Sequence, residues 1–397
     1  MKILFIAMSD SIHTARWINQ IADMGWDIHL FPSRDFGATH PDLKNVSIYH
    51  SMYGIKNNNN THVLYYGHPV FSKVLAGIIR LIMSKISPNY RVNQLKKVIS
   101  EVKPDIIHSL EFQAAGYLTL TVKKIYPEKF PIWIATNWGS DIYYFGRFPE
   151  HKEKIKEILE HCDYYSCECE RDLELAKKLG FKGKYLPVIP NAGGFEGVKS
   201  TPNRKSKKTS DRHIILVKGY QGWAGRALIG LDAIEQCASD LKNYKVLIYS
   251  CNSAEVRKKA NYLHKKTGIF ISILPPVSHD ELMQIFEESR VYLGISISDA
   301  ISTSLLESMV TGAFPIQSDT SCANEWITDG ISGFIVPAED PRIVAEKLKI
   351  AINNDVLVDR AAELNTATAQ KRLDYHLIKK QVISEYEKII ADSHIIT

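Results

Sequence analysis

The sequence predicts an α/β fold made of two doubly wound parallel sheets, one in each half of the chain. In the first half, short apolar segments alternate with amphipathic ones, which is the pattern of strands alternating with helices. A polar, basic stretch at 197–212 interrupts this alternation, and the alternation then begins again. A chain of 397 residues is also long for one hydrophobic core, which favours two domains.

The first half contains strand-like and helix-like segments in turn. The expected strands are Lys2–Ala7, Asp27–Phe31, Val46–His50, Asp105–Ser109, Ile132–Thr136, Tyr164–Cys167 and Lys184–Ile189. The expected helices, with apolar residues three or four apart, are Thr14–Met24, Ala114–Tyr126, Lys152–His161 and Arg171–Leu179. Gly25 and Gly180 come directly after two of these helices, where glycine commonly ends them. Since helical crossovers join parallel strands, this order indicates a parallel sheet.

The second half repeats the pattern after the basic stretch, which has few large apolar residues and is the expected linker. Its strands are Ile214–Val217, Lys245–Tyr249, Phe270–Ile273, Val291–Ile297 and Phe314–Ser318. Its helices are Ala227–Cys237, Ala254–His264, Asp280–Ser289, Pro341–Asn353 and a last amphipathic one around Asp374–Ala391. We therefore expect an N-terminal domain at 1–196, a second domain at 213–372, and a C-terminal helix at 373–397 that packs back on the first domain.

Two acids, Asp299 and Glu307, mark the most informative segment. Asp299 follows a predicted strand, and Glu307 lies on the helix behind it, which Ser302, Thr303 and Ser304 open. The free N–H groups and positive end of such a helix suit a diphosphate, while a nearby carboxylate accepts hydrogen bonds from sugar hydroxyls. The segment predicts a nucleotide-sugar pocket. The alternatives are a helix cap for Asp299 and a solvent-facing acid for Glu307.

A glycine-rich loop follows the first strand of the second half and carries a cation at each end, Lys218 and Arg226. Glycines beside a strand end favour phosphate binding, and Gly219 allows the backbone to approach a ligand. We expect Arg226 to be the stronger diphosphate clamp, because its guanidinium adds a bidentate fork to a helix start. The alternative is a pair of solvated loop charges.

Composition narrows the class of protein. Apolar residues make up 45% of the chain and charged residues 23%, which is ordinary for a soluble globular protein. The sequence contains no uncharged apolar run long enough to cross a membrane, so no transmembrane helix is expected. Met1–Ala7 is expected to be a buried strand rather than a signal peptide, since charged residues follow at once. The six cysteines do not form a disulfide or zinc pattern, so we expect reduced thiols, no metal and a cytoplasmic location.

Positive charge gathers in one part of the chain. Leu43–Ser100 contains no acidic residue but has eight basic ones: Lys44, Lys56, Lys73, Arg80, Lys85, Arg91, Lys96 and Lys97. Within it, Val70–Ile86 carries apolar residues at helical spacing, which is typical of a helix on an anionic membrane surface. A half-buried helix with a solvated basic rim and a basic groove for an anionic acceptor are the alternatives.

Across nearly its whole length the chain resembles a known family. The resemblance rests on these segments, in the family's order: Ser9–Trp17, Trp138–Ile142, Ile189–Gly193, Pro276–Leu282, Asp299–Glu307, Thr311–Ile316 and Asp329–Val336. They are similar to segments of the GT-B glycosyltransferases of family 4, which are retaining enzymes that use nucleotide sugars. The resemblance implies two Rossmann-like domains facing across a cleft.

The resemblance also implies a function. We expect transfer of a hexosyl or N-acetylhexosaminyl group from a nucleoside-diphosphate sugar, with UDP as the expected nucleotide. The acceptor would be a saccharide or a lipid-linked one, in polysaccharide or glycoconjugate synthesis. By this resemblance Glu307 contacts the ribose, Asp299 the donor sugar, and Val277 lies near the base. The resemblance also implies that Asp141 borders the donor sugar and that His13, Arg16 and Glu111 contact the acceptor.

The chain departs from the family pattern at two points. The first acid of the pair is usually Glu, and Asp299 is one methylene shorter, which bears on the identity of the sugar. Many members have a histidine after the threonine that matches Thr136, but Asn137 and Trp138 follow here. These departures keep open a catalytically silent nucleotide-sugar-binding subunit, and a UDP-sugar epimerase of the same fold is a second alternative. No Asp-x-Asp motif is present, so we expect catalysis without metal or cofactor, and no nucleic-acid partner.

Overall fold

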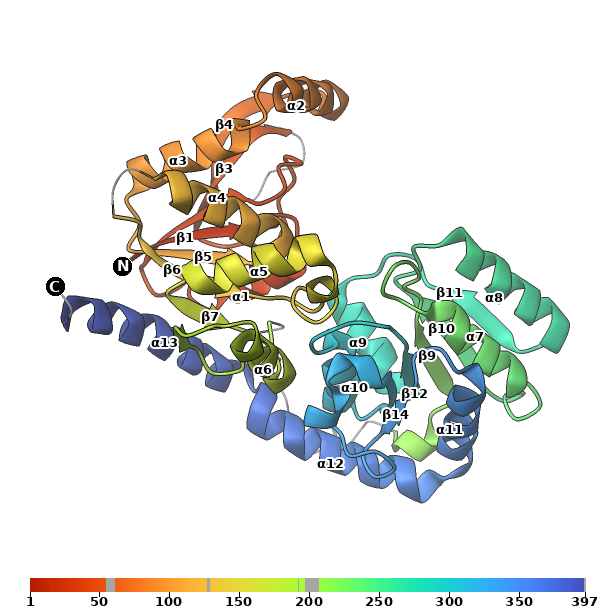
Figure 1. Ribbon diagram of the computed structural model, residues 1–397. Helices are drawn as coiled ribbons and strands as arrows, with labels where there is room; N and C mark the ends of the chain where they lie inside the picture. The colour runs from red at the N-terminus through yellow and green to blue at the C-terminus, as the bar shows by residue number, and fades with distance from the viewer. Residues whose placement is uncertain (55–60, 127–128, 192, 197–206, 396–397) are drawn as a thin grey trace. The chain divides into compact units, whose positions relative to one another are not determined.

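The computed structural model describes residues 1–54, 61–126, 129–191, 193–196 and 207–395 (Figure 1). The chain forms two compact units. Unit 1 comprises Met1–Gly194 together with His376–Thr397, and unit 2 comprises Phe195–Tyr375. Each contains one parallel sheet with helices packed on it, so the predicted α/β class is confirmed.

Unit 1 is built on an eight-stranded sheet. Its strands are β1 (Lys2–Ala7), β2 (Asp27–Pro32), β3 (Val46–Gly54), β4 (Val63–Val70), β5 (Ile106–Leu110), β6 (Ile132–Thr136), β7 (Tyr164–Ser166) and β8 (Lys184–Tyr185). They lie in the order β4-β3-β2-β1-β5-β6-β7-β8, and all neighbours are parallel. Its helices are α1 (Ile12–Asn19), α2 (Lys73–Ile86), α3 (Tyr90–Val102), α4 (Tyr117–Ile125), α5 (Pro149–His161), α6 (Glu170–Lys178) and α13 (Tyr375–Ile395).

Strand β1 shows why this sheet has a core on each face. Successive side chains of a strand point to opposite faces, and all of β1 from Ile3 to Ala7 is fully buried. Leu4 and Ile6 pack with residues of α3, α4 and α5, which cover the near face in Figure 1. Ile3 and Phe5 pack on the other face with residues of α1 and α13. The unbroken apolar run that predicted this strand reflects burial on both sides.

Helix α13 completes the second of these cores. Ile378, Val382, Tyr386 and Ile389 are buried there. The Tyr386 hydroxyl accepts a hydrogen bond from Trp17 Nε1 at 3.0 Å and lies 2.6 Å from His108 Nδ1. His108 Nε2 lies 2.6 Å from the hydroxyl of Thr136. His108 is thus fully paired with hydroxyl groups inside the core, as expected for a structural histidine.

The buried site of His108 predicts a pH dependence of stability. Burial lowers the pKa of His108 from 6.5 to about 3, so below pH 6.5 the unfolded chain takes up a proton that the folded chain does not. The contribution of this group to stability is therefore complete above pH 6.5 and is lost as pH falls towards 3. Replacing His108 with glutamine should reduce the loss of unfolding free energy between pH 6.5 and 5 by about 2 kcal/mol. Urea unfolding of both proteins at the two pH values measures this, and equal losses would contradict it.

Unit 2 is built on a six-stranded sheet. Its strands are β9 (Ile214–Lys218), β10 (Lys245–Tyr249), β11 (Phe270–Ile273), β12 (Ser289–Gly294), β13 (Phe314–Ser318) and β14 (Phe334–Val336). Their order, β11-β10-β9-β12-β13-β14, with all neighbours parallel, is that of a Rossmann fold. Its helices are α7 (Ala227–Gln236), α8 (Ala254–Thr267), α9 (His279–Glu288), α10 (Thr303–Thr311), α11 (Pro341–Asn353) and α12 (Asp355–Leu373).

The linker predicted at 197–212 is wrong over its last part, while 197–206 lie outside the described residues. Thr209–Asp211 form a short 3-10 helix in unit 2. The Thr209 hydroxyl donates to the carbonyl of Gly312 at 2.7 Å, and Arg212 Nη1 donates to the carbonyls of Ser289 and Thr311. Thr209 and Arg212 are buried, and these hydrogen bonds to backbone carbonyls satisfy their side-chain donors inside unit 2.

The strand predicted at Val291–Ile297 is also corrected, since β12 ends at Gly294. Ile295 accepts a hydrogen bond from the N–H of Arg226, and Ile297 donates to the carbonyl of Ala224. The three residues after β12 therefore pair with the glycine-rich loop rather than with the sheet. Two loops that are distant in sequence are joined in this way at one edge of unit 2.

Candidate functional site

The order of strands in unit 2 places its switch point between β9 and β12, which lie side by side. The helix after β9 and the helix after β12 belong to opposite halves of the sheet, and the carboxyl ends of two such strands are where open α/β sheets bind their ligands. The loops that leave them are the glycine-rich loop and the segment that contains Asp299. The two predicted binding segments therefore meet at one edge of the sheet.

The glycine-rich loop is folded around the side chain of Arg226. Nη1 of Arg226 donates to the carbonyls of Gly222, Trp223 and Gly225 at 3.0, 3.4 and 3.0 Å. Its Nε lies 3.2 Å from Oε1 of Glu339. In this conformation the guanidinium holds its own loop in shape, and its contact with a diphosphate stays a prediction.

Gly219 lets the strand ends of β9 and β10 come close together. Its N–H donates to the carbonyl of Tyr249 at 2.7 Å. A Cβ at this position would lie 2.6 Å from Cγ2 of Ile248 and 2.8 Å from that carbonyl oxygen. The need for glycine here is thus accounted for by the approach of the two backbones, and its predicted contact with a nucleotide sugar remains untested.

Lys218 is the last residue of β9 and places its ammonium group among the acids of the site. Burial acts to lower the pKa of Lys218, but the field of Tyr292, Asp299 and Glu307 outweighs it and raises that pKa. Lys218 therefore carries its charge at neutral pH. Among the described residues only the field of neighbouring groups, and no hydrogen bond, acts on its ammonium group, which leaves its donors available to an anion.

Helix α10 begins at the same edge, with Ser302 as its N-cap residue. The hydroxyl of Tyr249 donates to Oγ of Ser304 at 2.6 Å, and that of Tyr292 lies 3.4 Å from Oγ of Ser302. Two buried tyrosines from β10 and β12 thus fix the start of the helix. The N–H groups of Thr303 and Ser304 meet no acceptor among the described residues, so the positive helix end is open to an anion.

Asp299 lies before this helix and is half-buried. Its Oδ1 accepts the N–H of Ala300 at 3.0 Å. The alternative that Asp299 caps the helix is wrong, because the N-cap residue is Ser302, three residues later.

Glu307 is buried on α10 with 4% of its surface exposed, so the solvent-facing alternative is wrong. Its Oε1 lies 3.0 Å from Nε2 of His279, the first residue of α9. Ser278 caps α9 through a capping box with Glu281, and Val277, in the turn before it, is half-buried. His279 lies within the segment Pro276–Leu282 that carries the resemblance, but its role is not legible in the sequence, because only the packing of α9 on α10 brings it to Glu307.

His279 is expected to hold the Glu307 carboxylate in place. Replacing His279 with alanine removes this donor, and we expect the affinity for UDP to fall about three- to tenfold, the value of one hydrogen bond. Glutamine at the same position keeps an N–H donor and should restore part of the affinity. Calorimetric titration with UDP tests both variants, with His213→Ala, an exposed histidine before β9, as the control. Equal affinities for the wild type and His279→Ala would overturn the positioning role.

In unit 1, Glu111 and Asp141 are buried at the carboxyl ends of β5 and β6. Glu111 accepts hydrogen bonds from the N–H groups of Ala114 and Ala115, and Asp141 accepts them from Phe112 and Trp138. Burial raises the pKa of Glu111. Burial, and then the charge of Glu111, raises the pKa of Asp141 well above its ordinary value. Asp141 thus joins the β5 and β6 loops through Phe112, while Glu111 holds its own loop, and the predicted substrate contacts of both acids stay predictions.

His13 and Arg16 lie one turn apart on α1, both half-buried. The ring of His13 meets that of Trp138 edge to face, with centroids 5.8 Å apart. The indole Nε1 of Trp138 is buried, and no described residue accepts its hydrogen bond. An aromatic surface with a spare donor therefore lies beside His13, and contact of His13 and Arg16 with an acceptor is still a prediction.

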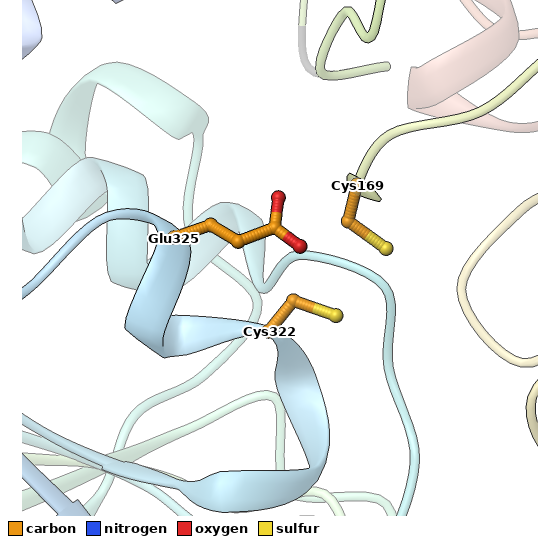
Figure 2. Close-up of side chains that lie close together, drawn as sticks. All are labelled: Cys169, Cys322 and Glu325. Carbon is orange, nitrogen blue, oxygen red and sulfur yellow. The ribbon is translucent and has the colours of Figure 1, made fainter. Parts of the chain in front are cut away.

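Unit 2 also contains cysteine and carboxylate side chains of the kinds that can bind a metal ion. Cys322 and Glu325 bound the short 3-10 turn Ala323–Glu325 (Figure 2). Cys169, drawn with them in Figure 2, belongs to unit 1, where it precedes α6. Two ligands within one unit are fewer than the three or four protein ligands of a zinc site. The sequence-based expectation of metal-independent chemistry stays a prediction.

Known proteins with similar sequences are glycosyltransferases. A phosphatidyl-myo-inositol mannosyltransferase of Mycobacterium leprae is 24% identical over 203 residues, 51% of this chain and 53% of that protein. An α-1,4-N-acetyl-D-galactosaminyltransferase of Campylobacter jejuni, which acts on an undecaprenol diphosphate-linked saccharide by its name, is 23% identical over 61% of this chain and 65% of that protein. The chain thus matches about half to two thirds of the length of these relatives.

Solved structures agree in fold over the whole chain. Sucrose-phosphate synthase of Thermosynechococcus elongatus aligns with a TM-score of 0.70 and 13% identity, over 99% of this chain and 100% of that one. Anabaena HepE in complex with UDP-glucose aligns with a TM-score of 0.68 and 14% identity, over 98% of this chain and 100% of that one.

Two family models match the chain in order. Residues 2–166 match the model described as glycosyl transferase 4-like, and residues 200–371 match that of the glycosyl transferases group 1. With two parallel α/β units in agreement, this chain belongs to the group 1 glycosyl transferases and has a two-domain GT-B fold.

Proposed function

We propose that the chain is a retaining glycosyltransferase that moves a sugar from a UDP-sugar to a saccharide or lipid-linked acceptor. One observation carries the proposal: Lys218, Asp299 and Glu307 gather around the open N-terminus of α10, at the switch point of unit 2. An ammonium group and free amides suit a diphosphate, and the carboxylates suit sugar hydroxyls. One small area thus has partners for each part of a nucleotide sugar.

The proposed residues contact different parts of the donor. The diphosphate lies against Lys218 and the amides of Thr303 and Ser304, while Glu307 accepts hydrogen bonds from the ribose hydroxyls. Asp299 accepts them from the transferred sugar. Arg226 holds the glycine-rich loop and, if its fork turns towards the site, adds a second cation to the diphosphate. We propose that no metal takes part.

The proposed reaction proceeds on one face of the sugar. The bond from C1 to the diphosphate oxygen breaks while the acceptor oxygen forms a bond to C1 on the same face. The acceptor proton passes to the departing diphosphate oxygen. Because negative charge grows on the diphosphate, Lys218 and the end of α10 stabilise the transition state more than the ground state. No carboxylate nucleophile is required by this route.

The relatives support the choice of substrates. HepE was solved with UDP-glucose, and the two sequence relatives are named for a phosphatidylinositol acceptor and an undecaprenol-linked one. We therefore propose a hexosyl or N-acetylhexosaminyl donor and a role in polysaccharide or glycoconjugate synthesis. His13, Arg16 and the Trp138 indole are the proposed acceptor contacts in unit 1. None of the six cysteines, all of them described, forms a disulfide, which suits a cytoplasmic location.

A panel of nucleoside-diphosphate sugars, read by mass spectrometry, tests this proposal. The full chain should release UDP from one or two UDP-sugars, slowly with water and faster with an added saccharide or polyprenyl acceptor. Binding of UDP without any release would favour a silent subunit instead. Conversion of one UDP-sugar into its epimer, with no transfer, would favour an epimerase.

A further inference from the structure

Helix α2 presents an apolar surface to solvent at the outer edge of unit 1 (Figure 1). Seven large apolar side chains in this region are 48% to 89% exposed: Phe71, Val74, Leu75, Ile78, Leu81, Ile82 and Ile86. From Val74 onward they recur three or four residues apart, so they form one stripe along the helix. A continuous exposed stripe of this kind, unlike scattered single residues, marks a surface that contacts an apolar partner.

The stripe faces outward because a polar anchor sets the orientation of the helix. Ala76 and Arg80 lie on the opposite side, where Ala76 is buried. Arg80 Nη2 donates to the carbonyl of Met52, and its Nε lies 4.0 Å from Oδ1 of the buried Asp35. Rotating the stripe inward would break both contacts of Arg80 and bury its guanidinium without a partner, which is costly, although Asp35 would keep Arg91 at 3.2 Å. The apolar face is therefore a fixed feature of the folded protein.

Charge indicates what covers the stripe. The 58 residues from Leu43 to Ser100 include eight basic side chains and no acid. Arg80 and Arg91 are directed at Asp35, and Lys97 on α3 lies 3.6 Å from Glu101, but Lys85 is exposed in the last turn of α2, beside the end of the stripe. A second copy of this face would bring like charges together. An anionic surface with an apolar interior complements both the lysines and the stripe.

We propose that α2 docks this chain on an anionic lipid bilayer, lying parallel to the surface with its stripe between the headgroups and the acyl chains. A helix of 14 residues is about 21 Å long and is too short to cross the hydrocarbon core. Among the described residues no helix has the length and hydropathy of a membrane span. The docking surface comprises residues 71–86 and contains none of the residues proposed to bind donor or acceptor, so it is independent of the proposed function.

Vesicle flotation tests the proposal with the full chain. The protein should float with vesicles that contain phosphatidylglycerol and remain largely unbound with vesicles of phosphatidylcholine alone. Val74→Glu and Ile82→Glu should each weaken the partition at least about tenfold, because a charge enters the apolar boundary. Val356→Glu is the matched control, since Val356 is an exposed valine on a helix of unit 2, and it should float like the wild type.

Three results would overturn the proposal. The wild type fails to float with phosphatidylglycerol vesicles, Val356→Glu loses as much flotation as the α2 variants, or both α2 variants float like the wild type. Sedimentation analysis covers the rival occupant: if the wild type is a dimer that Val74→Glu dissociates, and neither binds vesicles, the stripe is a self-association surface. Hydrolysis of the donor by Val74→Glu should equal that of the wild type, which separates loss of docking from loss of the catalytic site.

Discussion

Replacing Lys218 with methionine is expected to lower kcat for donor cleavage about 10²- to 10³-fold, the usual cost of removing one preorganised donor from a developing negative charge. Methionine keeps most of the side-chain volume and removes the ammonium group. The effect on kcat should exceed that on KM, because the charge on the diphosphate grows as its bond to C1 breaks. Initial rates of UDP release over a range of donor concentrations separate the two constants.

The control for Lys218 is another lysine of the same sheet. Lys245 is the first residue of β10 and therefore lies at the opposite edge of the sheet from the site, where it is exposed. Lys245→Met should turn over like the wild type. If Lys218→Met retains kcat within about threefold of the wild type, or if both variants lose activity equally, Lys218 does not stabilise the leaving group.

Replacing Glu307 with alanine is expected to take turnover below detection at donor concentrations that saturate the wild type. Two hydrogen bonds from ribose hydroxyls to a carboxylate contribute about 3–6 kcal/mol, which corresponds to about 10²- to 10⁴-fold in kcat/KM. Glutamine retains the shape and one acceptor oxygen but not the charge, so kcat/KM of Glu307→Gln should lie between those of Glu307→Ala and the wild type. In contrast with Lys218→Met, the main change should be in the affinity for the nucleotide. Kinetics and direct titration with UDP measure the two effects.

Glu363→Gln provides the control, because Glu363 is an exposed helix acid of unit 2. Thermal unfolding identifies any loss of structure, since Glu307 is buried and paired with His279. A folded Glu307→Ala protein with wild-type turnover would remove Glu307 from the site.

The strands and helices with strong apolar patterns could be predicted from the sequence. Strands Lys2–Ala7, Lys245–Tyr249 and Phe270–Ile273 and helix Pro341–Asn353 have the predicted bounds. The helix begins where Asp340 caps it through hydrogen bonds to the N–H groups of Arg342 and Ile343. Such elements are defined by burial and capping that depend only on residues close together in the sequence.

Other elements are missed because their burial has no strong apolar period. Helix α12 buries mainly alanines and small polar residues, among them Ala361, Ala362 and Ala369, so its pattern is weak. Strand β4 lies at the edge of the sheet, where Val63 is buried and its other residues are half-buried or exposed. Helix α3 is also absent from the predicted helices, although it buries Leu95, Val98, Ile99 and Val102 at helical spacing, and this pattern is present in the sequence.

The candidate site was predictable in its residue types but not in its partners. The loop and helix positions of Asp299 and Glu307 follow from the order of elements, and both acids lie at the expected edge of unit 2. The pairing of Glu307 with His279, and the contacts of Arg226 with its own loop, depend on packing between distant segments. The sequence favours Arg226 over Lys218 as the clamp, whereas in the structure Nε and Nη1 of Arg226 contact Glu339 and its own loop, and the ammonium group of Lys218 lies in the field of Asp299 and Glu307.

Calorimetric titration of UDP into the wild type, Lys218→Met, Glu307→Gln and Lys245→Met tests the central claim, that the switch point of unit 2 binds a nucleoside diphosphate. UDP should bind the wild type with a dissociation constant in the micromolar to millimolar range. Lys218→Met and Glu307→Gln should each bind at least about tenfold more weakly, which corresponds to about 1.4 kcal/mol, and Lys245→Met should bind like the wild type. Absence of UDP binding by the wild type, or one affinity shared by all four proteins, would contradict the account.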